Sequence, residues 1–192
     1  RSYIDQIVKR FHLDDPKEYS GRNTPLPACS SLNQLKSLMR VEGDKRLEEW
    51  AAAHSYPMII GSLIHAMVHT RPDIAYAVSV LSRSMAAPEL WHYKAAQHLI
   101  LYLRSSRDKG LMYSQKNMHQ QHTRVTAATE LYDPFMEGAV DASFADDNET
   151  HRSTSGFVVW LGGSPVDWEC KRQPLVTMST MESEYVAASK CV

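Results

Sequence analysis

Two acidic residues, Asp141 and Glu184, have the side-chain type and the sequence context expected of metal ligands. Asp141 follows a short apolar run that predicts a β-strand. Glu184 follows Ser179 and Glu182, whose spacing is that of a helix-capping box, so it should lie in the second turn of a helix. If this strand and helix meet at one end of a small sheet, both carboxylates could bind one divalent cation, since Mg²⁺ prefers oxygen ligands.

Strand patterns surround both acidic residues. Residues 157–161 are β-branched and aromatic, and residues 166–171 alternate apolar with charged side chains, as in a strand with one wet face. Between them, the segment 162–165 has two glycines and a proline, which predict a turn. We therefore predict a three-stranded antiparallel sheet, in chain order, over residues 136–180, with a helix from Ser179 packed on one face.

The first 114 residues predict a helical module. Residues 32–56 are polar and predict one or two short helices. Thr70 should cap a helix that Pro88 ends, and Leu111–Tyr113 should form a short strand. Three antiparallel helices would make a small bundle. The segments with the clearest helical spacing of apolar residues are 3–11, 58–68, 74–85 and 91–103.

These patterns indicate an α+β chain with two modules. The helical module spans 1–114, a linker without apolar periodicity spans 115–134, and the sheet with its helix spans 135–192. The nine histidines do not suggest a metal site, and His92 is expected to be structural. The three cysteines are scattered, so idle thiols are a better explanation than a disulfide framework.

Composition favours a globular intracellular protein of the cytoplasm or nucleus. Hydrophobic residues make up 43% of the 192, and no run approaches the length of a membrane span. The net charge of −1 conceals an asymmetry: residues 1–129 hold 17 lysines and arginines against 11 acidic residues, and residues 130–192 hold 4 against 11. A basic half that attracts phosphates and an acidic half that binds Mg²⁺ would suit nucleic-acid processing, although two ordinary solvated surfaces explain the charge equally well.

Several blocks of sequence resemble the Pol polyproteins of copia-type retrotransposons. The blocks after residue 140 resemble the ribonuclease H region, and the earlier ones resemble the end of the reverse transcriptase, so that 1–114 would be a thumb-like or connection-like region. The resemblance runs in order over almost the whole chain. Its main blocks are Thr70–Val78, Leu81–Arg83, Asp141–Ser143, Arg152–Phe157, Leu161–Trp168 and Ser179–Tyr185.

This resemblance implies roles for particular residues. Asp141 and Glu184 would be catalytic ligands of Mg²⁺ or Mn²⁺ in two-metal hydrolysis of the RNA strand of an RNA–DNA hybrid. Basic residues of the helical module, Arg71, Lys94 and Arg104, would contact the hybrid or a primer–template. The other partner would be the rest of the polyprotein, and no membrane partner is expected.

Two hypotheses about function remain open. The family has a Tyr-x-Asp-Asp type polymerase motif upstream and two further nuclease carboxylates downstream, and none of them is found in these 192 residues. Asp146 and Asp147 lie in an acidic loop and are not a substitute. We therefore expect weak metal binding and no activity from this chain alone. It is either a piece of a reverse transcriptase and ribonuclease H enzyme, or a non-catalytic relic or co-opted module that binds nucleic acid or another partner.

Overall fold

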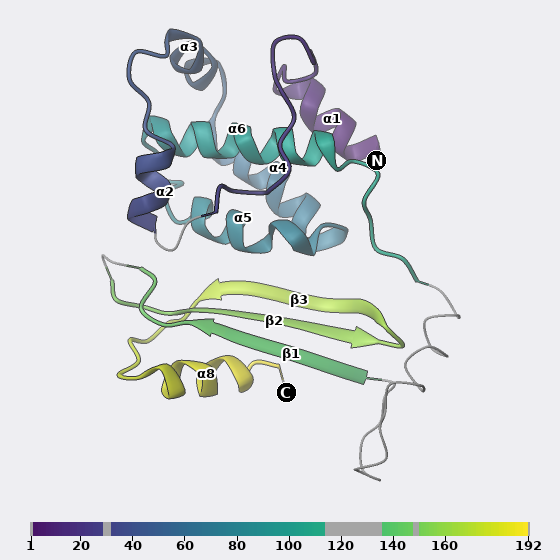
Figure 1. Cartoon of the computed structure of the whole chain (residues 1–192), viewed down its shortest axis with the longest axis vertical. Helices are drawn as coiled ribbons and strands as arrows, with labels where there is room; N and C mark the ends of the chain where they lie inside the picture. Colours follow the sequence, from purple (N-terminus) through teal and green to yellow (C-terminus); the bar gives the residue numbers. More distant parts are fainter. Residues whose placement is uncertain (1, 29–31, 114–135, 148–149, 192) are drawn as a thin grey trace. The chain divides into compact units, whose positions relative to one another are not determined.

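The computed structural model describes residues 2–28, 32–113, 136–147 and 150–191. The chain divides into two compact units, Arg1–Gly110 and Leu111–Val192. The first is helical, and the second has a three-stranded antiparallel sheet and one helix (Figure 1). The α+β fold predicted from the sequence is confirmed. No helix in the described ranges is both long and apolar enough to cross a bilayer.

Helix α6 (Leu90–Ser105) is the centre of the first unit. Helices α1, α3, α4 and α5 all contact it, and its residues Ala95, Leu99 and Leu103 are fully buried (Figure 1). A helix that buries so much apolar surface draws its stability from packing more than from its own propensity. The surrounding elements are α1 (Ser2–Arg10), α2 (Leu32–Leu38), α3 (Lys45–Ala53), α4 (Tyr56–His69), the 3₁₀ turn η1 (Pro72–Ile74) and α5 (Ala75–Ser82).

The start of α5 differs from the prediction. Thr70 does not cap it, because its backbone N–H donates to Ala66 and ends α4. The turn η1 lies in between, since Pro72 has no N–H and keeps the preceding Arg71 out of the α-helical region. Helix α5 also ends at Ser82, before Pro88.

The second unit contains β1 (Met136–Ser143), β2 (Thr154–Leu161), β3 (Ser164–Arg172) and α8 (Thr180–Ala188), in sheet order β1-β2-β3. The predicted sheet and helix are confirmed. Gly162 and Gly163 alone form the turn between β2 and β3, with φ of 55° and 77°. A two-residue turn of this kind requires positive φ at both positions, which glycine adopts without strain.

The segment Leu111–Tyr113 is not a strand and does not close the helical unit. It belongs to the second unit, where Ser164 Oγ donates to the carbonyl of Met112 at 3.0 Å and Tyr113 Oη donates to that of Pro165 at 2.8 Å. The predicted linker, 115–134, lies outside the described residues.

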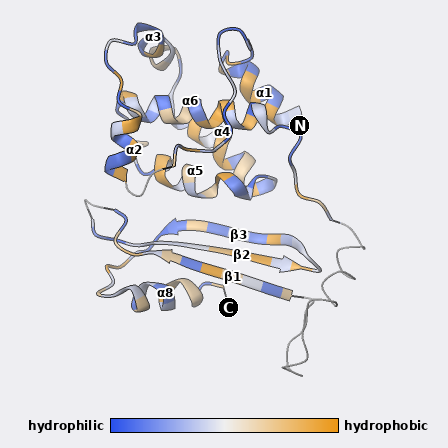
Figure 2. Cartoon of the chain, in the orientation of Figure 1, coloured by the Kyte–Doolittle hydropathy of each residue, from blue (hydrophilic) through white to orange (hydrophobic). Residues whose placement is uncertain are grey.

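Figure 2 shows the contrast between the apolar helices α4 and α5 and the more hydrophilic strand β3.

Candidate functional site

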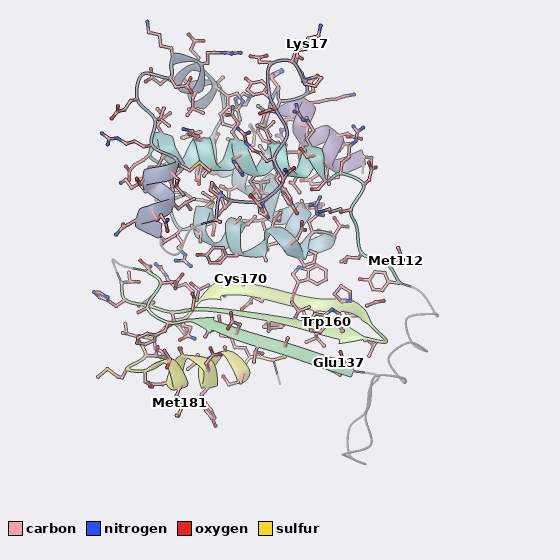
Figure 3. All side chains as sticks on the ribbon, in the orientation of Figure 1. Lys17, Met112, Glu137, Trp160, Cys170 and Met181 are labelled. Atoms are coloured by element: carbon pink, nitrogen blue, oxygen red, sulfur yellow. The ribbon has the colours of Figure 1, made fainter. Side chains whose placement is uncertain are left out.

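Asp141 lies on β1, on the sheet face that α8 does not cover. It pairs with Gly156 and is exposed. Side chains alternate along a strand, and a Cβ added to Gly138 would come within 3.0 Å of the Cys191 sulfur at the end of α8. Even-numbered residues of β1 therefore face α8, and Asp141 faces the other side. Figure 3 shows Trp160, which shares that second face, pointing away from α8.

Glu184 lies in the second turn of α8, as predicted, and is exposed. Ser179 Oγ accepts a hydrogen bond from the N–H of Glu182 at 3.2 Å, which is one half of the predicted capping box. The other half differs, because the Glu182 carboxylate accepts from the N–H of Met178 at 2.6 Å instead of that of Ser179. Both bonds fix where the helix begins, and so they fix the position of Glu184.

A buried glutamine fastens this part of α8 to the sheet. Gln173 Nε2 donates to Ser155 Oγ at 2.7 Å and to the carbonyl of Ser183 at 2.9 Å. Ser155 pairs with Ala142, the neighbour of Asp141, and Ser183 is the neighbour of Glu184. The start of α8 therefore lies beside the end of β1. The structure brings the segments of both acidic residues to one end of the sheet, with Asp141 on the uncovered face.

The acidic loop after β1 has a structural role. Asp146 accepts hydrogen bonds from Thr154 Oγ1, at 2.8 Å to each carboxylate oxygen. Asp147 is buried, forms an ion pair with Arg172 and accepts from Thr150 Oγ1 at 2.8 Å. These carboxylates hold the loop against β2 and β3. Within the described ranges, no three His, Cys, Asp or Glu side chains gather closely enough to hold a metal ion.

The prediction that Arg71 binds nucleic acid is wrong for this fold. Its side chain is 2% exposed, and Nε and Nη2 donate to the two carboxylate oxygens of Asp73 at 2.8 and 2.7 Å. Its Nη1 donates to the carbonyl of Ser106 at 3.1 Å. Burial by itself would raise the pKa of Asp73, but hydrogen bonds from Arg71 and Tyr102 and the Arg71 charge outweigh burial and lower it.

Arg104 is also engaged within the fold. Its Nη1 donates to the carbonyl of Leu13 at 2.5 Å and its Nη2 to that of Tyr19, so it fixes the segment after α1. Lys94 has an exposed hydrogen bond, from Nζ to the carbonyl of Arg40 at 3.0 Å. Arg104 and Lys94 are both half-buried, and their contacts with nucleic acid stay predictions.

Two groups of histidines have different roles. His92 is structural, as expected: it is buried, and its Nδ1 accepts from the N–H of Glu89 at 2.9 Å at the start of α6. Burial lowers its pKa more than Glu89 raises it. His65 and His69 are exposed on α4 with their rings stacked. Sequence reasoning overlooked this pair, although a spacing of four residues in a predicted helix was a sufficient signal.

The chain is similar to transposon polyproteins over most of its length. It is 31% identical over 188 residues to the retrovirus-related Pol polyprotein from transposon TNT 1-94 of Nicotiana tabacum, a match that covers 98% of the chain and 12% of that polyprotein. It is 34% identical over 185 residues to the Pol polyprotein from transposon RE1 of Arabidopsis thaliana, covering 96% of the chain and 11% of that protein.

A shorter protein is similar as well. The secreted RxLR effector protein 161 of Plasmopara viticola is 36% identical over 135 residues, which cover 70% of the chain and 84% of the effector. No protein-family model and no solved structure matches the chain.

Proposed function

Because the chain belongs to the retrovirus-related Pol polyproteins of copia-type transposons, we propose that its second unit is part of a ribonuclease H domain. The first unit then belongs to the end of a reverse transcriptase. A protein of this kind would copy RNA into DNA and hydrolyse the RNA strand of an RNA–DNA hybrid. Its partners would be the hybrid or a primer–template, and the rest of the polyprotein.

The observation that carries this proposal is the position of α8 beside β1. Gln173 holds Ser183 of α8 against Ser155, opposite Ala142, so the neighbours of both acidic residues lie within one hydrogen-bonded group. Glu184 and Asp141 are both exposed, so a cation from solvent can reach either carboxylate. β1 is an edge strand of the sheet, so a cation bound beside it could be approached from either face.

The chemistry of these ligands suits Mg²⁺ or Mn²⁺, which take carboxylate oxygens. When bound as a pair, such ions activate a water and stabilise the leaving 3′ oxygen. The role of Asp141 and Glu184 is to hold the ions in place with their negative charge. Two carboxylates are few ligands for two ions, and the described residues offer no acidic cluster of three, so we expect binding on the order of millimolar.

A Mn²⁺ titration followed by nuclear magnetic resonance tests the site. Paramagnetic broadening should begin at the end of β1 and in the first two turns of α8. Asp141→Asn and Glu184→Gln each remove one charge with little change in shape, and each should abolish this broadening. Asp167→Asn is the matched control, since Asp167 is an exposed carboxylate on β3. Unchanged broadening in Asp141→Asn would reject the site.

Activity gives a second measurement. We expect no measurable cleavage of an RNA–DNA hybrid by the 192-residue chain. A polyprotein that supplies further acidic ligands should cleave the hybrid with Mg²⁺, and Asp141→Asn in that polyprotein should remove the cleavage. Cleavage that survives both Asp141→Asn and Glu184→Gln would show that the catalytic ligands lie elsewhere.

A non-catalytic binding role is the second candidate. One relative, of which the chain covers 84%, is named as a secreted effector and not as a polyprotein. Under this alternative, hybrid or protein binding would not need Mg²⁺, and neither acidic substitution would alter it. Lys94→Ala should weaken hybrid binding under both candidates if its exposed ammonium contacts a phosphate. The two candidate functions are therefore distinguished by whether binding depends on Mg²⁺, and not by whether the chain binds at all.

A further inference from the structure

Two exposed histidines lie one turn apart at the C-terminal end of α4. The rings of His65 and His69 are stacked, with centroids 4.1 Å apart and planes inclined by 22°. A spacing of four residues places both side chains on one face of the helix. We propose that His65 and His69 form a binding site for a divalent transition-metal ion that takes imidazole ligands, namely Cu²⁺, Ni²⁺ or Zn²⁺.

The hydrogen bond of His69 determines which of its ring nitrogens is free. Its Nδ1 lies 2.8 Å from the backbone carbonyl oxygen of His65. A carbonyl oxygen can only accept a hydrogen bond, so Nδ1 carries the proton and donates it. The lone pair of the neutral ring is then on Nε2, at the outer edge of the imidazole. An Nδ1–H bonded to a carbonyl is the arrangement that orients a metal-ligating histidine.

The separation of the rings suits a shared ion. Nitrogen ligands bind Zn²⁺ at about 2.0–2.1 Å, so two nitrogens on one ion are about 3 Å apart. The ring centroids are 4.1 Å apart, so the two imidazoles already lie close to the separation that a shared ion requires. Existing contacts also restrict His65, because the ring of Tyr3 lies 4.5 Å from it. Tyr3 is itself held by a hydrogen bond from its hydroxyl to the carbonyl of Ser62, at 3.2 Å.

The position on the helix favours a cation. His69 is the last residue of α4, where the unpaired carbonyls give the helix end a partial negative charge. A divalent ion bound there would interact favourably with that charge. No third His, Cys, Asp or Glu side chain joins the pair among the residues that the structure covers, so water would complete the coordination shell.

The ligand type separates this site from the proposed nuclease site. Imidazole suits Cu²⁺, Ni²⁺ and Zn²⁺, whereas Mg²⁺ prefers carboxylate and water oxygens. The pair also lies in the helical unit, and the acidic residues lie in the other. The proposed metal site on α4 is therefore independent of the proposed nuclease function, and a separate measurement tests it.

The test is a titration of the full chain with Cu²⁺ and Ni²⁺. Electron paramagnetic resonance of bound Cu²⁺ should show two nitrogen ligands. In nuclear magnetic resonance spectra, the backbone signals that Cu²⁺ broadens should centre on the last two turns of α4. Affinity should fall in the order Cu²⁺, Ni²⁺, Co²⁺. With free Ni²⁺ at a hundred times its Kd, the melting temperature of the helical unit should rise by roughly 10 °C.

Matched variants identify the ligands. His65→Ala and His69→Ala should each weaken metal binding by about tenfold or more. Loss of a residue that only holds a metal ligand in place already weakens binding by about tenfold, and loss of the ligand itself should cost at least as much. Both side chains are exposed, so neither variant should unfold the chain. The control is His119→Ala with His122→Ala, which removes the other closely spaced pair in the sequence and should leave binding intact. Absence of binding, wild-type affinity in His65→Ala and His69→Ala, or broadening centred away from α4 would each overturn the proposal.

Discussion

Arg71 is the residue whose environment says most about the helical unit. Its guanidinium binds both carboxylate oxygens of Asp73, and its Nη2 donates to Ser106 Oγ at 2.7 Å. Tyr102 Oη donates to Asp73 at 2.6 Å, and the Tyr102 ring lies 5.4 Å from the guanidinium carbon. Ser106 is the C-cap of α6, and its carbonyl accepts hydrogen bonds from Arg71 Nη1 and from the N–H of Lys109, at 3.0 Å. The network joins the end of α6 to the turn before α5.

Removing this side chain should be costly. Arg71→Ala leaves Asp73 without its ion partner and removes two hydrogen bonds to Ser106, so we expect a loss of about 3 kcal/mol in the free energy of unfolding. Urea denaturation followed by circular dichroism would measure it. Arg40→Ala is the matched control, because Arg40 pairs with Glu42 at side-chain exposures of 75% and 73%. That change should stay within about 0.5 kcal/mol. Equal losses in the two variants would contradict the argument.

The pH dependence of the same pair provides a check. The folded-state pKa of Asp73 is lowered, so its ionised form stabilises the fold at pH values above its unfolded pKa of about 4. This contribution is lost as the pH falls through the folded value. The difference between wild type and Arg71→Ala should therefore shrink below about pH 4, and the part that persists comes from the bonds to Ser106.

Single residues also show what sequence patterns can predict. The position of Asp141 on a strand and of Glu184 in the second turn of a helix were predictable, because an apolar run and a capping box indicate these backbone positions before any fold is known. Arg71 was misinterpreted because a basic residue next to a predicted helix start has the same pattern whether it is solvated or buried. Its burial depends on Ser106 and Tyr102, about thirty residues away. No local pattern contains that information.

At the scale of elements, α8 packs on β1 and β2, and one buried side chain adds hydrogen bonds that fasten it to the sheet. Gln173 is fully buried, and its amide nitrogen links β2 to α8. Its carbonyl oxygen Oε1 has no hydrogen-bond partner in the part of the chain that the structure describes. Gln173 thus makes two good hydrogen bonds and leaves one acceptor unsatisfied. Its net contribution to the stability of the second unit is therefore smaller than the two bonds alone would suggest.

Two substitutions separate these contributions. Gln173→Leu removes both bonds and the unsatisfied oxygen, so the second unit should lose about 1–2 kcal/mol. Gln173→Glu should cost more, because a carboxylate cannot donate to the Ser183 carbonyl and places two acceptors face to face. Amide hydrogen exchange of α8 measures both effects. Lys171→Ala, at an exposed position on β3, should leave exchange unchanged. Equal rates of amide exchange in the two Gln173 variants would show that the hydrogen bonds of Gln173 do not hold α8 on the sheet.

Elements were predictable where one pattern dominated. The strands have alternating side chains, and two consecutive glycines specify the turn between β2 and β3. The start of α5 was not predictable, because Thr70 and Pro72 also suit a helix start and only the packing of Ile74 and Arg71 favours a 3₁₀ turn. The face on which Asp141 lies depends on the position of α8 in three dimensions, which residue spacing does not give.

At the scale of the whole molecule, the two units differ in how much apolar surface they leave exposed. The helical unit encloses a continuous core around α6. In the second unit, α8 exposes Met181 (Figure 3). The exposed fractions of Met181 and Tyr185 are 80% and 78%, and Met178, just before the helix, is 89% exposed. Residues four apart on a helix lie on the same face, so Met181 and Tyr185 form one apolar stripe. Apolar groups gathered in this way commonly mark a contact surface.

This stripe should bind a hydrophobic dye such as anilinonaphthalene sulfonate. The double substitution Met181→Lys with Tyr185→Lys should reduce dye fluorescence severalfold, because the stripe loses both of its large side chains to charged ones. The melting temperature should not fall, since neither side chain is buried and surface changes usually cost less than about 0.5 kcal/mol. Met112→Lys is the control: Met112 is 73% exposed but lies on a segment without a helix, so it should change the fluorescence little. Dye binding that persists in the double variant would place the exposed apolar surface elsewhere. A large fall in melting temperature would instead show that Met181 and Tyr185 pack against other parts of the protein in solution.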